Sequence, residues 1–175
     1  MSDDRTGVGT YSVFGTTIRH KMSEGFPILT TKKVFYRQAI HETLWMFIQG
    51  SSDCTYLKDN KVNIWAQWLQ NTPEYPNGTI GNIYGTVLRS FRVDREDPNN
   101  TIDQLERCID LIKTDPNSRR IVMTAFDPRF VADAELTFKE NVEAGNGVLN
   151  PCHSNFIQFK VTNNKLSAYF VQRSA

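Results

Sequence analysis

Long apolar runs and a cysteine framework are both absent from this sequence of 175 residues. No apolar run approaches the roughly 20 residues that cross a bilayer. Residues 1–5 are polar and acidic, whereas a secretory signal is basic and then apolar. The three cysteines are an odd number and include no Cys-x-x-Cys pair. We therefore expect no membrane protein, disulfide scaffold or zinc module, but free thiols in a reducing cytoplasm.

An excess of charge of one sign is also absent. Lysine plus arginine number 20 and aspartate plus glutamate 19, which gives a formal net charge of +1. This balance removes the main electrostatic argument for a nucleic-acid or membrane-surface binder. With 39% hydrophobic and 22% charged residues, the composition is that of a globular protein, and the length fits one domain, residues 1–175.

The spacing of apolar residues predicts two helices. The first covers residues 34–49, because Ile40, Leu44 and Ile48 recur at helical spacing and Gly50 follows where a C-cap is expected. The second is predicted to begin at Thr101, with Gln104 as its capping-box partner, and to end at Asp115-Pro116. Its predicted buried stripe consists of Ile102, Leu105, Ile109 and Ile112.

Strands and loops are predicted elsewhere. Residues 121–126 are typical of a buried strand, and residues 157–171 of a hairpin that turns at Asn163-Asn164. Turn-forming residues predict a loop at 70–82 and a surface excursion at 133–147. The last strand runs to the end of the chain without a turn or cap, which favours a carboxy-terminal truncation or one piece of a longer protein.

Pro151-Cys152-His153 is the first candidate for chemistry. A cysteine thiolate is accessible near neutral pH and highly polarizable, which suits attack on a soft electrophile. The alternative is structural: Cys152 is then a small buried apolar residue, and His153 points to the other face of a strand.

Arginines occur in three turn or strand-end contexts. Arg5 lies in a turn, Arg119 and Arg120 follow a helix stop, and Arg173 with Ser174 closes the last strand. Several guanidinium groups and a hydroxyl are what a phosphate monoester dianion requires. Taken singly, each arginine is more simply a solvated surface residue, but their shared contexts favour phosphate binding.

Three further positions have a functional and a structural interpretation. Glu42 lies among apolar neighbours on a predicted helix, where its raised pKa would let it relay a proton, unless it is an exposed glutamate paired with a base. Trp65 and Trp68 form either a stacking wall for a flat heterocycle or part of the core. Tyr84 is either a hydroxyl donor near a base or a half-buried strand residue.

In their order and spacing, eight blocks of sequence resemble the thymidylate synthase family. The resemblance extends from Asp4 to Ser174, which is almost the whole chain. The blocks are DRTGVGT (4–10), FPILTTKK (26–33), HETLW (41–45), IW (64–65), YG (84–85), DPNSRR (115–120), PCH (151–153) and QRS (172–174).

The resemblance implies a methyltransferase of dTMP biosynthesis that acts without a metal. Its co-substrate 5,10-methylenetetrahydrofolate would supply carbon and hydride to C5 of deoxyuridine monophosphate (dUMP) and leave as dihydrofolate. Cys152 would add covalently to C6, Glu42 would relay protons through water, and Tyr84 would assist removal of the C5 proton. The implied fold is α+β, with a mixed β-sheet packed against helices in a single domain and a cytoplasmic homodimer packed sheet to sheet.

The resemblance also implies two sets of binding residues. Those for the nucleotide are Arg5, Arg173, Ser174, Gln172 and His153, together with Arg119 and Arg120 reaching across the dimer interface. Those for the folate are Ile64, Trp65, Trp68 and Leu149 against its ring, and Lys32 and Phe35 near its glutamyl side.

Departures from the family pattern concern mainly the folate side. Ala66 stands where the family usually has an acidic residue, Phe35 replaces a histidine, and residues 126–128 read Phe-Asp-Pro instead of Trp-Asn-Pro. The family also continues beyond Ser174 with residues for folate, base and ribose, so we expect the 175-residue chain alone to be inactive or nearly so. The alternatives are a pyrimidine nucleotide hydroxymethylase acting on dUMP or dCMP, and a catalytically silent fragment.

Overall fold

A computed structural model describes the protein at residues 7, 9, 13–94 and 96–173. The chain divides into two compact units, Met1–Phe35 and Tyr36–Ala175. The described part of the first unit contains a 3-10 turn, η1 (Met22–Glu24), and an exposed ion pair between Lys21 and Glu24 at 3.7 Å. From residue 13 onward, every side chain of this unit is exposed.

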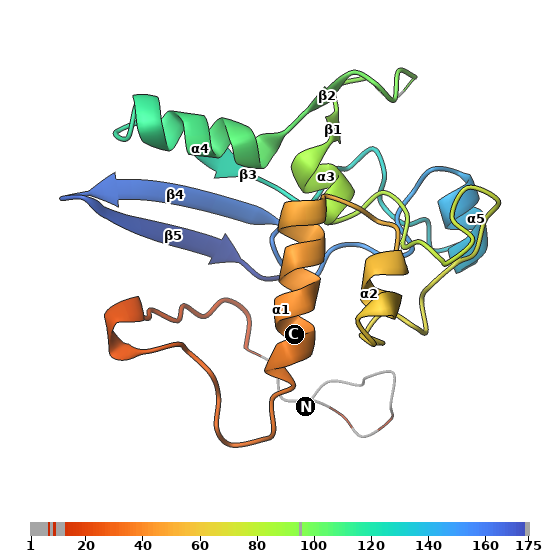
Figure 1. Ribbon diagram of the computed structural model, residues 1–175, viewed down its shortest axis with the longest axis horizontal. Coiled ribbons are helices and arrows are strands. Elements are labelled where there is room, and N and C mark those ends of the chain that lie inside the picture. The colour runs from red at the N-terminus through yellow and green to blue at the C-terminus, as the bar shows by residue number, and fades with distance from the viewer. Residues whose placement is uncertain (1–6, 8, 10–12, 95, 174–175) are drawn as a thin grey trace. The chain divides into compact units, whose positions relative to one another are not determined.

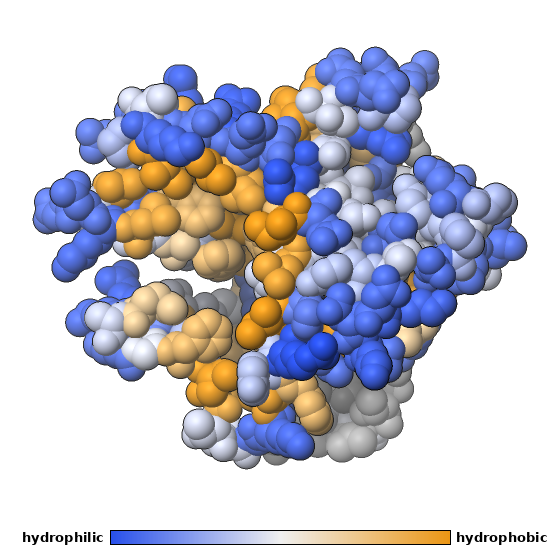
Figure 2. All heavy atoms as spheres, viewed as in Figure 1, coloured by the Kyte–Doolittle hydropathy of each residue, from blue (hydrophilic) through white to orange (hydrophobic). Residues whose placement is uncertain are grey.

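The first predicted helix is confirmed in the second unit. Helix α1 (Tyr36–Leu44) continues into a π-helical turn, η2 (Trp45–Gln49), which ends at Gly50 with a left-handed φ of 59°. Trp45 and Met46 of the π turn are buried. The regularly spaced residues Ile40, Leu44 and Ile48 are instead exposed, and Figure 2 shows apolar side chains gathered over this helix.

The second predicted helix begins later than expected. Helix α4 spans Gln104–Thr114, and its N-cap is Asp103, whose carboxylate accepts a first-turn backbone N–H at 2.9 Å. Thr101 lies instead in the short strand β2 (Thr101–Ile102). Aspartate and threonine both serve as N-caps, so the sequence pattern alone did not separate them. Ile102 and Ile109 are exposed, and the packed side consists of Leu105, Cys108, Leu111 and Ile112.

Side chains at the start of α4 tie it to its neighbours. Gln104, predicted as a capping partner, donates instead to the carbonyls of Val87 and Thr124 at 2.8 and 2.9 Å. Arg89 of α3 (Gly85–Arg89) forms an ion pair with Asp103 at 2.8 Å. The remaining helices are α2 (Thr55–Asp59) and α5 (Phe138–Glu143).

The strands pair only antiparallel within the described residues. Strand β1 (Phe91–Arg92) pairs with β2, and a second sheet has the order β3 (Val122–Met123), β4 (Phe156–Thr162), β5 (Lys165–Val171). Mixed helices and sheets confirm the α+β class, but the described strands form no mixed sheet. The predicted strand at 121–126 is limited to β3.

The hairpin β4–β5 is confirmed with its turn (Figure 1). Thr162 pairs with Lys165, so Asn163 and Asn164 form a two-residue turn, and both have positive φ, at 50° and 57°. Asparagine tolerates this conformation, as a type I′ turn requires. The chain therefore returns in register along β4.

The segment 133–147, predicted as a surface excursion, is exposed at most of its positions. It contains α5, which begins with a capping box formed by Thr137 and Glu140. Asn141 of this helix is buried, and its amide nitrogen donates to the carbonyl of Asp133 at 3.0 Å. A buried amide that satisfies loop carbonyls fixes the segment against the rest of the unit. Residues 70–82 form a loop, as predicted.

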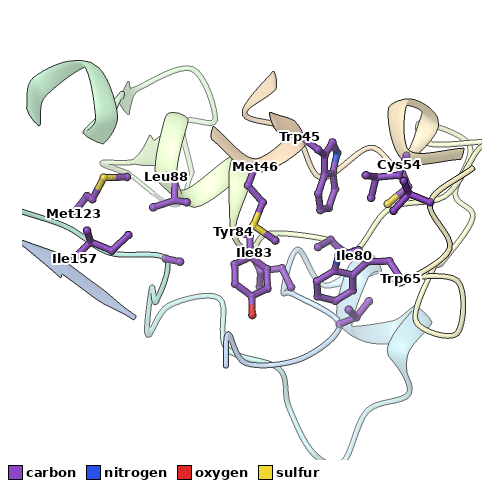
Figure 3. Packing of buried hydrophobic residues seen from close by; sticks show 14 of the residues in the cluster. Trp45, Met46, Cys54, Trp65, Ile80, Ile83, Tyr84, Leu88, Met123 and Ile157 are labelled. Atoms are coloured by element: carbon purple, nitrogen blue, oxygen red, sulfur yellow. The ribbon is translucent and has the colours of Figure 1, made fainter. Parts of the chain in front are cut away.

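The core of the second unit lies between the helices and the small sheet (Figure 3). Its largest fully buried side chains include Trp45, Tyr84, Leu88 and Ile157. Cys54 and Cys108 are buried free thiols, and Cys152 is half-buried. None of the helices in the described residues has the length and apolarity needed to span a bilayer.

Burial along the sheet predicts a graded loss of stability. Ile157 and Leu166 lie on the same face of the β4–β5 hairpin, but Ile157 is fully buried and Leu166 is 58% exposed. Ile157→Ala should lower the free energy of unfolding by about 2–5 kcal/mol, because it leaves a cavity. The control Leu166→Ala should change it by about 0.5 kcal/mol or less. If urea titrations showed that both variants lose the same free energy of unfolding, the difference in burial between Ile157 and Leu166 would be contradicted.

Candidate active site

Cys152 is held from its backbone by a tyrosine distant in sequence. The N–H of Cys152 donates to the hydroxyl oxygen of Tyr84 at 2.9 Å, across 68 residues. Tyr84 precedes α3 with a φ of 48°, which is rare for an aromatic residue. Its ring is buried, and Figure 3 shows it beneath Met46 with the hydroxyl directed away from that side chain. Burial raises the pKa of the Tyr84 phenol, so it keeps its proton at neutral pH.

Arg173 fastens the same loop from the other side. Its backbone N–H donates to the carbonyl of Cys152 at 2.7 Å. Its guanidinium donates from Nε to the carbonyl of Pro151 at 3.2 Å and from Nη2 to that of Asn150 at 3.3 Å. Three hydrogen bonds therefore attach Arg173, the second residue after β5, to the loop that bears the thiol.

Glu42 and Trp65 form a second link. The indole Nε1 of Trp65 donates to Oε1 of Glu42 at 2.8 Å. Burial raises the pKa of the Glu42 carboxyl, and the hydrogen bond from Trp65 opposes part of that rise by stabilising the carboxylate. Trp65 also meets Tyr84 edge to face, with ring centroids 5.7 Å apart. An acidic side chain on α1 is thus connected through one indole to the tyrosine that holds Cys152.

His153 packs against the same tyrosine. The two ring centroids are 4.7 Å apart and the planes are inclined by 31°. Its Nδ1 lies 3.1 Å from the hydroxyl oxygen of Ser154. Burial lowers the pKa of the imidazole, which is therefore neutral at neutral pH.

A cavity of about 400 Å³ opens beside these residues. It joins the α1–η2 helix, the segment after Cys152 and the end of β5. Its walls combine an acid, an imidazole and an amide with apolar side chains, a composition that suits a small polar ligand. The lining residues are Glu42, Thr43, Met46, Phe47, His153, Ser154, Phe170, Val171 and Gln172.

The predicted catalytic residues, His153 and the predicted folate wall differ in how the structure connects them. Cys152, Tyr84, His153, Glu42 and Trp65 are connected as described, although the sequence separates them widely. Trp65 is only 8% exposed, so it belongs to the core, which was the structural interpretation. The other predicted wall residues pack half-buried against that core and keep an open side: Ile64, Trp68 and Leu149.

Other predicted residues are not joined to this cluster. Arg119 and Arg120 are exposed, and their side chains have no hydrogen bond or ion pair within the part of the chain that is described. Arg5 and Ser174 lie outside the described residues. The folate candidates Lys32 and Phe35 belong to the first unit, where both are exposed.

One residue of the site was missed in the sequence. Ser154 lines the cavity, contacts His153 and has a left-handed φ of 58°. Its only signal in the sequence was its position after the Pro-Cys-His block. No group of His, Cys, Asp and Glu suited to a metal ion occurs among residues 7, 9, 13–94 and 96–173.

Comparison with known proteins gives a consistent result over the whole chain. The family model described as thymidylate synthase matches residues 1–175. A thymidylate synthase of Francisella philomiragia is 44% identical over 172 residues, which cover 98% of this chain and 58% of that protein. A thymidylate synthase of Francisella tularensis subsp. holarctica is 43% identical over 175 residues, which cover 100% of this chain and 59% of that protein. The chain therefore spans less than two thirds of the length of these curated relatives.

The hydrogen bond between Trp65 and Glu42 predicts that the pKa of the Glu42 carboxyl changes when the indole is removed. Trp65→Phe removes the one donor among the described residues that stabilises the charged carboxylate, so the pKa of Glu42 should rise further above that of an ordinary glutamate. The protonated-carboxyl band in infrared spectra, identified by its loss in Glu42→Gln, should then persist to higher pH. Trp68→Phe is the control, since its indole makes no such bond. An unchanged titration in Trp65→Phe would refute this coupling.

Proposed function

We propose that this chain, which belongs to the thymidylate synthase family, serves in the reductive methylation of dUMP to dTMP. The observation that supports this most strongly is the convergence on one loop. Cys152 is tied to Tyr84 and Arg173, and Tyr84 contacts His153 and Trp65. A half-buried cysteine whose backbone is held by a phenol and an arginine suits covalent catalysis on a flat ring.

Cys152 is the proposed nucleophile. Its sulfur adds to C6 of the pyrimidine, the C5–C6 double bond is lost, and the electron pair is delocalised over C5 and the O4 carbonyl. C5 thereby becomes a carbon nucleophile, which the unmodified uracil ring lacks. C5 bonds to the one-carbon unit of the co-substrate 5,10-methylenetetrahydrofolate and loses its proton, and the folate then gives up a hydride to that carbon and leaves as dihydrofolate. Loss of the sulfur at the end restores the free thiol.

Glu42 is the proposed proton relay. Because its pKa is raised by burial, the carboxyl keeps its proton at a higher pH than an exposed glutamate. It lines the cavity of about 400 Å³ together with His153 and Gln172. A protonated carboxyl there can donate toward O4 as negative charge develops on that oxygen.

Tyr84 is proposed to have two functions. Its oxygen accepts the N–H of Cys152, which fixes the loop. Its own hydroxyl proton remains in place, because burial raises the phenol pKa. By donating a hydrogen bond, the hydroxyl can hold a water in place, and that water accepts the C5 proton and passes it on to solvent.

The nucleotide phosphate is assigned to the arginines. Arg173 uses Nε and Nη2 for the Cys152 loop, and its Nη1 has no hydrogen bond to another described residue, so we assign Nη1 to phosphate oxygens. Arg5, Ser174 and Gln172 would complete the binding site for the nucleotide on this side of the loop. Arg119 and Arg120 are exposed, and we propose that they act in the site of a second copy of the chain, in a homodimer packed sheet to sheet.

The folate ring is assigned to the open side of the tryptophan cluster. Trp68, Ile64 and Leu149 are half-buried and offer aromatic and apolar surface, while Trp65 supports them from the core. Lys32 and Phe35 are proposed for the glutamyl side. Both relatives are named thymidylate synthase, which does not favour the hydroxymethylase alternative. The reaction needs a reduced thiol, as a reducing cytoplasm provides.

Covalent trapping tests the nucleophile. The full product of the gene, incubated with 5-fluoro-dUMP and methylenetetrahydrofolate, should gain the mass of both ligands on Cys152. The reaction stops there because the next step removes the C5 hydrogen as a proton, and a fluorine at C5 cannot be removed in that way. Cys152→Ala should form no adduct and lose turnover by about 10³-fold or more. Cys108→Ala, which removes a buried thiol, should still react. A mass gain on another residue, or none on Cys152, would refute the proposal.

Subunit mixing tests the arginines. A Cys152→Ser chain and an Arg119→Ala/Arg120→Ala chain, each inactive alone, are co-expressed with different tags. If the arginines act in the partner's site, random pairing gives about half mixed dimers with one intact site each, hence about a quarter of normal activity. Replacing the second chain by Arg107→Ala, an exposed cation of α4, controls for lost surface charge. No recovery in purified mixed dimers would place the arginines in their own chain's site.

A further inference from the structure

Ser154 has a backbone conformation that serine rarely adopts. Its φ is 58°, in the left-handed region that favours glycine and asparagine. Its carbonyl oxygen accepts the N–H of Ala125 at 2.8 Å, which anchors the residue beside the end of β3. Its side chain is nearly buried, in a residue only 6% exposed. The structure therefore holds this hydroxyl in one place at some cost in backbone strain.

The position of the hydroxyl determines the direction of its hydrogen bond. A buried O–H needs an acceptor, and Nδ1 of His153, at 3.1 Å, is the partner of this hydroxyl within the described residues. If Nδ1 carried the hydrogen and donated to the serine oxygen, the hydroxyl hydrogen would have no acceptor among the described residues. The arrangement that satisfies both groups has the serine donating and Nδ1 accepting.

A neutral imidazole that accepts at Nδ1 carries its hydrogen at Nε2. The Tyr84 ring covers one face of His153, with centroids 4.7 Å apart, so the imidazole is held against rotation. His153 lines the cavity with Glu42, and no hydrogen bond joins Nε2 to another described residue. The Nε2–H group is thus available to a ligand.

We propose that Ser154 is a positioning residue: its hydroxyl donates to Nδ1 of His153 and fixes the imidazole as the Nε2–H tautomer, a hydrogen-bond donor for an acceptor oxygen of the bound ligand. The identity of that ligand rests on the proposed function, but the tautomer does not. Ser154 acts through His153 and touches no reacting atom. A ligand with a carbonyl or carboxylate oxygen at this point fits the donor, whereas one with an amino group does not.

Nitrogen NMR of the imidazole tests this directly. The chain has three histidines, so ring-¹⁵N labelling gives three pairs of signals, and loss of one pair in His153→Gln assigns the site. At a pH where His153 is neutral, its Nδ1 should resonate downfield as the bare nitrogen and Nε2 upfield as the protonated one. The opposite assignment in the unaltered protein would overturn the proposal without any further variant.

Two variants then isolate the hydroxyl from the backbone. Ser154→Ala and Ser154→Gly both lack it, but glycine adopts a φ of 58° without strain. Both should shift the tautomer ratio toward Nδ1–H by about two- to tenfold, which is the effect expected from one hydrogen bond. Ser167→Ala, on exposed β5, should change nothing, and the His41 signals report whether the fold is intact.

A ratio unchanged in both Ser154 variants would also overturn the proposal. If the alanine variant unfolds, the glycine variant and the unaltered protein still decide the question. The spectrum needs no substrate, so its failure leaves the proposed methylation standing. Conversely, absence of a Cys152 adduct would leave the tautomer assignment standing.

Discussion

The hydrogen bond from the Cys152 N–H to the Tyr84 hydroxyl is the contact on which the site depends. It connects a loop that carries a thiol to a residue at the centre of the core. Tyr84 then contacts His153 on one side and Trp65 on the other, and Trp65 holds Glu42. Removal of the phenolic oxygen would leave a half-buried N–H without its partner, a penalty of about 1–3 kcal/mol.

Burial has different effects on the groups around this contact. It raises the pKa values of Tyr84 and Glu42 and lowers that of His153. Each shift favours the neutral form, as desolvation must. The cavity is therefore lined at neutral pH by a neutral imidazole and by a carboxyl that holds its proton more firmly than an ordinary glutamate. Positive charge comes from Arg173, whose guanidinium also fastens the loop.

Local sequence signals predicted the elements that local residues determine. The hairpin β4–β5 was predictable because two asparagines supply the positive φ values of its turn, and the helix before Gly50 because its ending is encoded at that glycine. The start of α4 was not predictable, since Thr101 and Asp103 both suit an N-cap. The helical spacing of Ile40, Leu44 and Ile48 did not predict their burial, because exposure depends on what packs there.

In the candidate site too, the sequence pointed to individual residues but not to the contacts between them. The sequence identified Cys152, Glu42, Tyr84 and Trp65, but their connections join residues up to 68 positions apart and no local pattern encodes them. Trp65 lies in the core, which was the structural interpretation, and also donates to Glu42, a contact that the sequence did not predict. Ser154 was missed because a serine has no signal for a left-handed φ, and its role depends on the ring beside it.

The central claim is that Cys152 faces a pyrimidine ring while Tyr84 holds its backbone. A crystal structure of the full gene product with dUMP tests it most directly. The account predicts the Cys152 sulfur in contact with C6, the bond from its N–H to Tyr84 retained, and Glu42 and His153 lining the same cavity. A nucleotide bound away from this loop, or a sulfur turned into the core with the Tyr84 bond broken, would contradict it.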